Sequence, residues 1–216
     1  MQNINVVMLG VIIANVLFSM AGFNKPDFFE KYKFNIASIK NGEKLRMFTS
    51  GFLHADITHL LFNMYTLYMF APILIKYLGG TSFLLVYLAS LLLGSVFSFY
   101  FHKNEPYYSA IGASGAVSGV LYSSILLYPD MSLYLFFIPI PIPSYVFGIG
   151  YLLYSIYGMK KQHGNIGHDA HFGGAVGGYV LTLLLVPNLL QTNILMVVLL
   201  AIPIVLLYFL HKMGKI

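Results

Sequence analysis

The sequence predicts an all-α fold, a polytopic bundle of membrane-spanning helices. Of its 216 residues, 58% are hydrophobic and only 9% are charged, whereas a soluble domain carries about 25% charged residues. The mean hydropathy is +0.78, and seven apolar stretches are bounded by glycine, proline or charged residues. A helix crosses a bilayer core of about 30 Å with about 20 apolar residues. The chain is therefore expected to be an integral, multi-pass membrane protein.

The predicted spans cover residues 4–22, 57–77, 82–101, 114–128, 143–157, 170–186 and 192–210. The first lacks the basic segment and the small-residue cleavage site of a signal peptide, so it is interpreted as a retained span.

Composition also excludes some classes of function. The chain has no cysteine, so a disulfide framework, a thiolate zinc site and a cysteine nucleophile are excluded. The net charge of +5 comes from 12 Lys+Arg against 7 Asp+Glu, and in a membrane protein such residues anchor helix ends at lipid headgroups. No nucleic-acid partner is expected, whereas the lipid bilayer is.

The fourth span is short and begins at a polar run, "GASGAVSG" at 112–119. Counted from Ser114 it has about 15 residues, or roughly 22 Å, too little to cross the hydrocarbon. It should therefore begin inside the membrane, with its free amide groups at the floor of a hydrated pocket. The prolines of "PIPIP" at 139–143 keep the fifth span from starting before 143, so that segment is expected to be extended.

Histidines open the second and sixth spans. His54 and His59 lie in "GFLHADITHLLFNM", and His168 and His171 lie in "GHDAHFGGAVGG". His59 and Asn63 are four residues apart, on one helix face, where both side chains can donate hydrogen bonds. From spacing alone they are as readily a polar pair that holds two membrane helices together as a functional pair.

Two seams of small residues can bring the fourth and sixth spans together. Gly174 and Gly178 follow His171 on its helix face, and Gly115, Ser118 and Gly119 follow Ser114. Such seams are common in membrane helices, but here each one begins with a reactive side chain, Ser114 or His171. Contact between the seams would place His171 beside Ser114.

That pairing indicates a serine hydrolase. Imidazole can take the proton of a serine hydroxyl near neutral pH, so a Ser114–His171 dyad suffices for acyl transfer. The backbone N–H of Ser114, together with His59 and Asn63, can donate to the developing oxyanion. Asp169 is two residues from His171 and points elsewhere on a helix, so no third triad member is predicted.

Three motifs in this order resemble the rhomboid family of intramembrane serine proteases. They are "HADITHLLFN", with the HxxxN element at His59 and Asn63; "GASG", with the GxSG element at Gly112, Ser114 and Gly115; and "AHFGG", the AHxGG element from Ala170 to Gly174. The resemblance covers about residues 1–187. It implies a six-helix catalytic core at 1–187, here with an extra, seventh transmembrane helix at 188–216, and cleavage of single-span membrane proteins without metal or cofactor.

The resemblance also implies individual roles. Ser114 is then the nucleophile and His171 the general base, while His59 and Asn63 donate to the oxyanion. His54 is a neighbouring histidine common in the family, and Gly112 shapes the loop. Arg46 matches the arginine of the family's WR element, with Leu45 in place of the tryptophan, and its expected role is structural.

The chain departs from the family at two points. Ser118 lies where many relatives carry an aromatic ring against the catalytic histidine. The sequence therefore does not show which side chain, if any, packs against His171. Every Lys and Arg except Lys76 falls on the side of the predicted active-site mouth. Positive-inside counting puts that side in the cytoplasm, whereas the family resemblance implies a cell-membrane protein that opens to the outside. The family expectation is preferred, and the oligomeric state is left open.

Three alternatives remain. A non-catalytic rhomboid-like protein would bind or route membrane clients, although both Ser114 and His171 are retained. A histidine-box di-iron oxidase would need about eight histidines, more than the chain's 7, three of which are peripheral. A transporter also uses broken helices and polar residues at the membrane midplane, but no internal repeat supports one.

Overall fold

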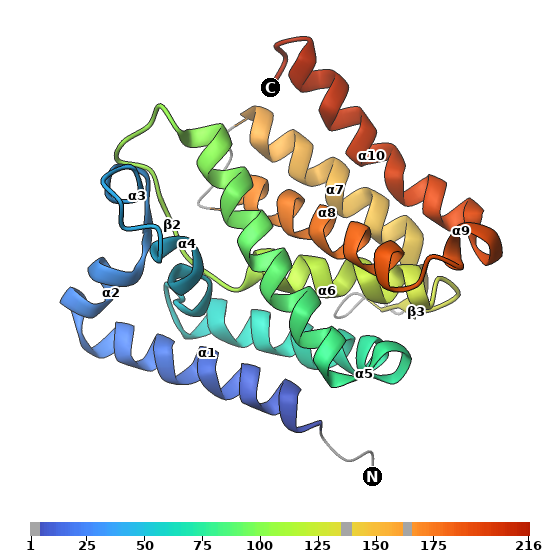
Figure 1. Cartoon of the computed structure of the whole chain (residues 1–216), viewed down its shortest axis with the longest axis horizontal. Helices are drawn as coiled ribbons and strands as arrows, with labels where there is room; N and C mark the ends of the chain where they lie inside the picture. The colour runs from blue at the N-terminus through green and yellow to red at the C-terminus, as the bar shows by residue number, and fades with distance from the viewer. Residues whose placement is uncertain (1–4, 135–139, 162–165) are drawn as a thin grey trace.

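The computed structural model describes residues 5–134, 140–161 and 166–216 as a bundle of helices (Figure 1). The all-α prediction is confirmed. The long helices are α1 (Val6–Asn24), α5 (Ile57–His102), α6 (Ser114–Leu127), α7 (Ser144–Lys161), α8 (His168–Leu185) and α10 (Ile194–Lys212). The short helices are α2 (Pro26–Tyr32), α3 (Ile36–Lys40), α4 (Arg46–Thr49) and α9 (Leu189–Thr192), and a 3-10 turn covers Ser50–Phe52. The paired strands are β1 (Phe34–Asn35) with β2 (Ser109–Ala110), and β3 (Ser132–Leu133) with β4 (Ile142–Pro143).

Helix α5 is two helices joined at a sharp break. Gly79 has φ 80° and ψ 167°, outside the helical region, and glycine is the residue that adopts a positive φ without steric cost. The two limbs on either side match the predicted spans 57–77 and 82–101. Figure 1 shows them crossing, the second limb in green.

The membrane assignment rests on three of the described helices. α1, α5 and α10 are long and apolar enough to cross a bilayer, and α5 supplies two limbs. The helices α6, α7 and α8 lie where the fourth, fifth and sixth spans are predicted. The chain is therefore an integral membrane protein with several apolar helices, as the sequence predicts.

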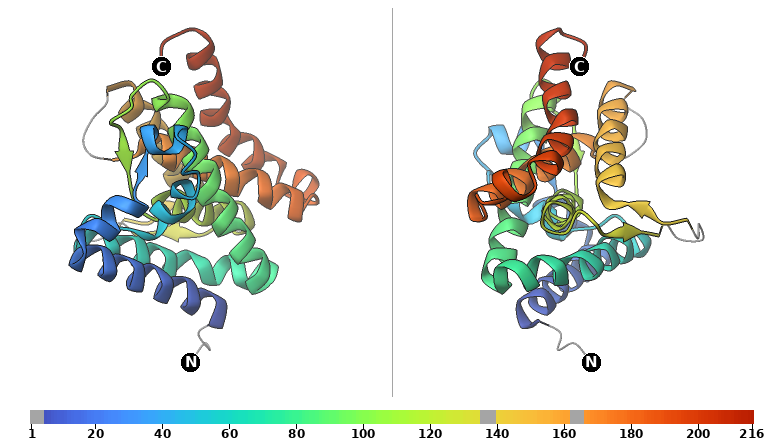
Figure 2. Two further views of the ribbon diagram at one scale, coloured as in Figure 1. Left: turned by 60° about the vertical axis from the view of Figure 1, so that its left-hand side comes forward. Right: turned by 90° about the vertical axis from the view of Figure 1, so that its right-hand side faces the viewer.

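Helix α6 occupies the centre of the bundle. It has 14 residues, and all of them after Ser114 are buried. Figure 2 shows it end-on in the right-hand view, surrounded by the other helices. At about 1.5 Å per residue it is shorter than the hydrocarbon core. Because protein rather than lipid surrounds it, its polar N-terminal end can lie at membrane depth.

The predicted contact between the small-residue seams is confirmed. A Cβ atom at Gly174 would collide with the carbonyl group of Gly115, and one at Gly178 with that of Gly119. The backbones of α6 and α8 therefore touch along two turns, as in small-xxx-small packing. The sequence did not single out Gly94 of α5, where a Cβ would lie 2.7 Å from the Ala170 carbonyl oxygen.

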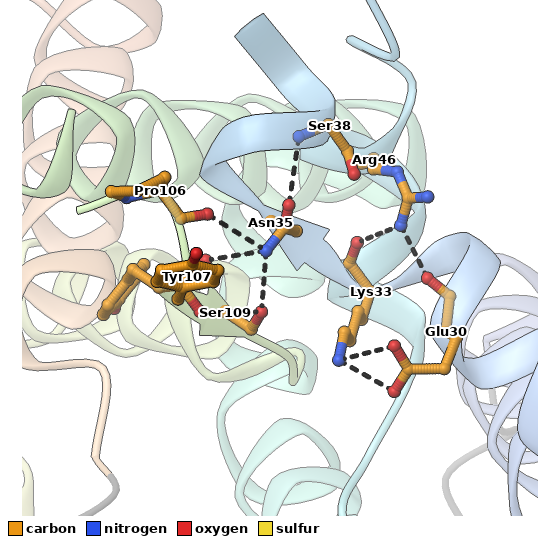
Figure 3. A network of polar contacts seen from close by, with 9 residues as sticks. Glu30, Lys33, Asn35, Ser38, Arg46, Pro106, Tyr107 and Ser109 are labelled. Carbon is orange, nitrogen blue, oxygen red and sulfur yellow. Dashed lines mark hydrogen bonds and ion pairs between the residues drawn. The ribbon is translucent and has the colours of Figure 1, made fainter. Parts of the chain in front are cut away.

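The loop after α1 is tied to the segment that leads into α6. β1 pairs antiparallel with β2, with Phe34 opposite Ala110 and Asn35 opposite Ser109. The Asn35 side chain also donates to Ser109 Oγ at 3.2 Å (Figure 3). This pairing fixes the chain a few residues before Ser114.

Arg46 holds the same loop from within. Its Nη1 donates to the carbonyl oxygens of Glu30 at 2.6 Å and Lys33 at 3.0 Å (Figure 3). Its Nε donates to the Glu43 carboxylate at 2.6 Å. These contacts join α2 and the residue that follows it to α4, an arrangement that fits the structural role expected for this arginine.

The C-terminal third of the chain adds α7, α9 and α10. Of the segment predicted to be extended, residues 142–143 form β4, whereas Pro139 lies outside the described residues. α10 continues through Pro203 as one helix. It is joined to α8 by a hydrogen bond from the Tyr179 hydroxyl to the Val197 carbonyl, at 2.9 Å.

Candidate active site

A tight turn places Ser114 at the start of α6. Gly112 has φ 119°, a conformation that side chains rarely adopt, and its N–H donates to the Ser50 carbonyl at 3.0 Å. Ala113 is the N-cap residue and provides no side-chain cap. The amide groups of the first turn of α6 are therefore left for another acceptor.

The imidazole of His59 lies against this turn. A Cβ built on Gly112 would be 2.8 Å from His59 Cε1, 2.9 Å from Nε2 and 3.8 Å from Ser114 Oγ. The helix that carries His59 begins at Asp56, whose carboxylate accepts a hydrogen bond from the His59 N–H at 2.8 Å. This cap fixes the start of α5, and with it the direction of the His59 side chain, beside the serine.

Asn63 lies one turn further along α5 and is buried. Its Nδ2 donates to the carbonyl of His59 at 3.1 Å. An amide group carries two hydrogens on Nδ2, so this bond occupies only one of them. The shared helix face predicted for His59 and Asn63 is thus seen, with the histidine nearer the turn of Gly112.

His171 lies in the first turn of α8, where its N–H donates to the Gly167 carbonyl at 3.0 Å. The Cβ position of Gly115 lies 3.1 Å from the carbonyl oxygen of Ala170, which brings the first turns of α6 and α8 together, so Ser114 and His171 belong to adjoining helix ends. Within the described residues, no hydrogen bond joins their side chains. Catalytic hydrogen bonds are often longer without substrate and tighten when it binds.

His54 lies behind the turn and is completely buried. Burial, and secondly the nearby His59, lowers its pKa to about 3, so the ring is neutral. Ser19 donates its single hydrogen to the Phe52 carbonyl at 3.0 Å, so His54 Nδ1–H donates to Ser19 Oγ, at 2.8 Å. His54 Nε2 is then the acceptor for the Ala113 N–H, at 3.5 Å. The sequence indicated no such contact with the turn before Ser114.

Asp169 faces away from His171. Its Oδ2 lies 3.8 Å from Nε2 of His102, at the end of α5, and the carboxylate is buried there. His102 stacks on Tyr108 with ring centroids 3.6 Å apart. This placement fits the prediction that Asp169 is no triad member.

The aromatic ring beside His171 belongs to a residue of α7, Tyr151, which the sequence analysis did not identify. Tyr151 stacks on His171 with centroids 5.8 Å apart and ring planes 21° apart. Its hydroxyl lies 2.5 Å from Ser118 Oγ, which also donates to the Ser114 carbonyl at 2.7 Å. The available signal was Ser118, at a position where the family resemblance implies an aromatic ring, but it did not show which helix would fill the space.

No group of three His, Asp or Glu side chains suited to a metal ion occurs in the part of the chain that the structure describes. Four of the described histidines lie in local pairs instead. His54 lies edge to face with His59 at 4.9 Å, and His168 with His171 at 6.3 Å. This arrangement gives the histidine-box alternative no support.

Comparison with known proteins agrees with the fold and the motifs. The model of the rhomboid domain matches residues 41–188. RHOMBOID-like protein 12, mitochondrial, of Arabidopsis thaliana is 32% identical over 186 residues, which are 78% of this chain and 55% of the relative. The chain thus spans about half the length of this plant relative.

Two bacterial relatives are similar over about two thirds of the chain. Putative rhomboid protease YdcA of Bacillus subtilis is 34% identical over 157 residues, 68% of this chain and 70% of the relative. Rhomboid protease GluP of the same organism is 36% identical over 143 residues, which are 65% of this chain and 26% of the relative. The fold and the matches define a polytopic helical membrane protein of the rhomboid type. The chain belongs to the rhomboid family.

Proposed function

We propose that this protein is an intramembrane serine endopeptidase that cleaves single-span membrane proteins. One observation carries the proposal: the turn of Gly112 presents Ser114 at the uncapped N-terminal end of a buried helix, against His59 and beside the helix whose first turn carries His171. Two relatives named as rhomboid proteases, one of them putatively, add support.

The reaction begins when Ser114 Oγ attacks the scissile carbonyl carbon and its proton passes to His171. The tetrahedral intermediate collapses to an ester on Ser114, the peptide C–N bond breaks, and His171 gives its proton to the leaving amine. Water then attacks the ester with His171 as base, which releases the carboxylic acid product and restores Ser114.

Donors for the oxyanion come from two helices. The Ser114 N–H lies in the free first turn of α6, and the His59 ring faces the same turn. Asn63 has an amide hydrogen beyond the one given to the His59 carbonyl. Groups fixed in advance at the place where negative charge develops stabilise the transition state.

His54 and Arg46 act at a distance from the reacting atoms. His54 accepts from the Ala113 N–H and so supports the turn before Ser114. Arg46 supports the first loop through the carbonyls of Glu30 and Lys33. Gly115 and Gly174 serve by having no side chain, which lets α8 approach α6.

A helical substrate must unwind locally, because its carbonyl groups are engaged in helical hydrogen bonds and screened by side chains. The bilayer holds both enzyme and substrate, and no metal or cofactor enters this reaction. We place the protein in a cell membrane with its site open to the outside, as the family resemblance implies.

The test is labelling by a fluorophosphonate probe, which reacts with an activated serine. Purified protein in detergent should be labelled, and labelling should vanish in both Ser114→Ala and His171→Ala. Each variant should keep the wild-type thermal unfolding midpoint within a few degrees. Labelling that persists in Ser114→Ala would show that the probe reacts elsewhere and would refute this assignment.

A non-catalytic role is the second candidate, and one observation favours it: Ser114 and His171 make no hydrogen bond to each other among the described residues. Such a protein would bind membrane clients through the same fold. The same experiment separates the two functions, because a folded wild type that is never labelled would support the binding role.

A further inference from the structure

The support of His171 differs from the one that the family resemblance implies, an aromatic ring one turn after the nucleophile. At that position this chain has Ser118. The space is filled from another helix: the ring of Tyr151, on α7, lies 5.8 Å from that of His171 and is inclined to it by 21°. Tyr151 also stacks on Phe147, with ring centroids 6.2 Å apart and ring planes inclined by 12°.

The hydrogen bonds around Ser118 give the hydroxyl of this buried ring a partner. Ser118 has one hydroxyl hydrogen and donates it to the Ser114 carbonyl, at 2.7 Å. The contact of 2.5 Å with the Tyr151 hydroxyl is therefore a bond that Tyr151 donates. Ser118 is almost fully buried, with 2% of its surface exposed. A serine here thus leaves room for a ring from α7 and provides the acceptor for its hydroxyl.

We propose that Tyr151 is the positioning residue for the general base His171, and that Ser118 and Tyr151 together replace the aromatic residue of the relatives. This inference rests on the proposed function, because it concerns the orientation of the proposed base. The ring of Tyr151, nearly parallel to the imidazole, limits its rotation and so fixes the direction of its ring nitrogens. The chain of contacts also links His171 to the backbone of the nucleophile itself through Ser118.

The ring and the hydroxyl of Tyr151 have separable effects. Loss of the ring should free the imidazole, and a displacement of about 1 Å can slow a reaction by ~10²-fold. Loss of the hydroxyl alone should leave the stack in place. A ring moved to position 118, with a serine at 151, should rebuild the arrangement of the relatives.

The experiment measures fluorophosphonate labelling at several probe concentrations, which gives kinact and KI separately. The variants are Tyr151→Leu, Tyr151→Phe and the exchange Ser118→Tyr with Tyr151→Ser. The matched control is Tyr157→Leu, because Tyr157 lies on α7 but is 55% exposed. Ser114→Ala defines zero labelling, and thermal unfolding midpoints are recorded for all.

We expect Tyr151→Leu to lower kinact by about 10- to 100-fold at unchanged KI. Tyr151→Phe and Tyr157→Leu should stay within about threefold of wild type, and the exchange should recover most of the loss. A role in packing alone would lower the unfolding midpoint of Tyr151→Leu without rescue by the exchange.

Each other outcome overturns the inference in a recognisable way. If Tyr151→Leu is labelled at the wild-type kinact while Ser114→Ala is not labelled, the inference fails and the proposed function stands. If Tyr151→Phe loses as much as Tyr151→Leu, the hydroxyl and not the ring is responsible, and the stacking role is wrong. If the folded wild type is not labelled, both proposals fail together.

Discussion

Gly112 and His59 are so close that no side chain fits between them. A Cβ at position 112 would lie 2.8 Å and 2.9 Å from two atoms of the imidazole. The same glycine has φ 119°, so its conformation and its surroundings both exclude other residues. His59 and Ser114, the proposed oxyanion donor and the proposed nucleophile, therefore lie on either side of one residue without a side chain.

We predict that Gly112→Ala abolishes fluorophosphonate labelling, to less than about 1% of wild type, because the new methyl group displaces His59. The matched control is Gly42→Ala, since Gly42 also has a positive φ, 102°, but no atom within 4 Å of the Cβ position. Both substitutions should lower the free energy of unfolding by about 1–2 kcal/mol, because an alanine must then adopt a left-handed conformation. Equal labelling of the two variants would show that the contact with His59 does not matter.

Removal of His59 or Asn63 should lower kinact by about 10²–10³-fold if one donor dominates and less if each compensates for the other. KI should change little, because the donors act mainly on the transition state. Thr66→Ala is the control: Thr66 bonds the Phe62 carbonyl as Asn63 bonds that of His59. A His59→Ala, Asn63→Ala double variant with wild-type kinact would remove both residues from the mechanism.

Asp169→Asn should be labelled within about threefold of the wild-type rate. Its carboxylate lies toward His102 at 3.8 Å, and loss of the acidic member of a true triad costs ~10⁴-fold. The variant should instead lower the thermal unfolding midpoint, because it removes a buried charge partner of His102. A loss near 10⁴-fold without unfolding would establish Asp169 as a third catalytic residue.

Gly178→Ala should destabilise the bundle by about 1–3 kcal/mol, since the methyl group would collide with the backbone of Gly119. Gly150→Ala is the comparison, because Gly150 lies in α7 with no atom within 4 Å of its Cβ position. There the substitution should be neutral or stabilising by up to about 1 kcal/mol. Unfolding in detergent measures both, and equal midpoints would mean that α6 and α8 do not touch at this turn.

Much of the fold could be predicted because it depends on short stretches of sequence. The lengths of the apolar stretches predicted the long helices, and the polar run before Ser114 predicted the start of α6. The break between residues 77 and 82 was visible as a pair of glycines, of which Gly79 takes the positive φ. The first loop was less predictable, since the short helices and the β1–β2 pairing depend on residues about 75 positions apart.

The sequence by itself determined which groups are available for the proposed chemistry: a serine at the start of one helix, histidines in the first turns of two others, and small residues that let helices touch. Only the tertiary structure decided how these helices are rotated about their axes. Rotation brought Tyr151 of α7 onto His171, placed His54 behind Ala113, and turned Asp169 toward His102. The physical reason is that side-chain periodicity fixes which residues share a face of one helix, whereas the face that meets a neighbour is chosen by packing among all the helices.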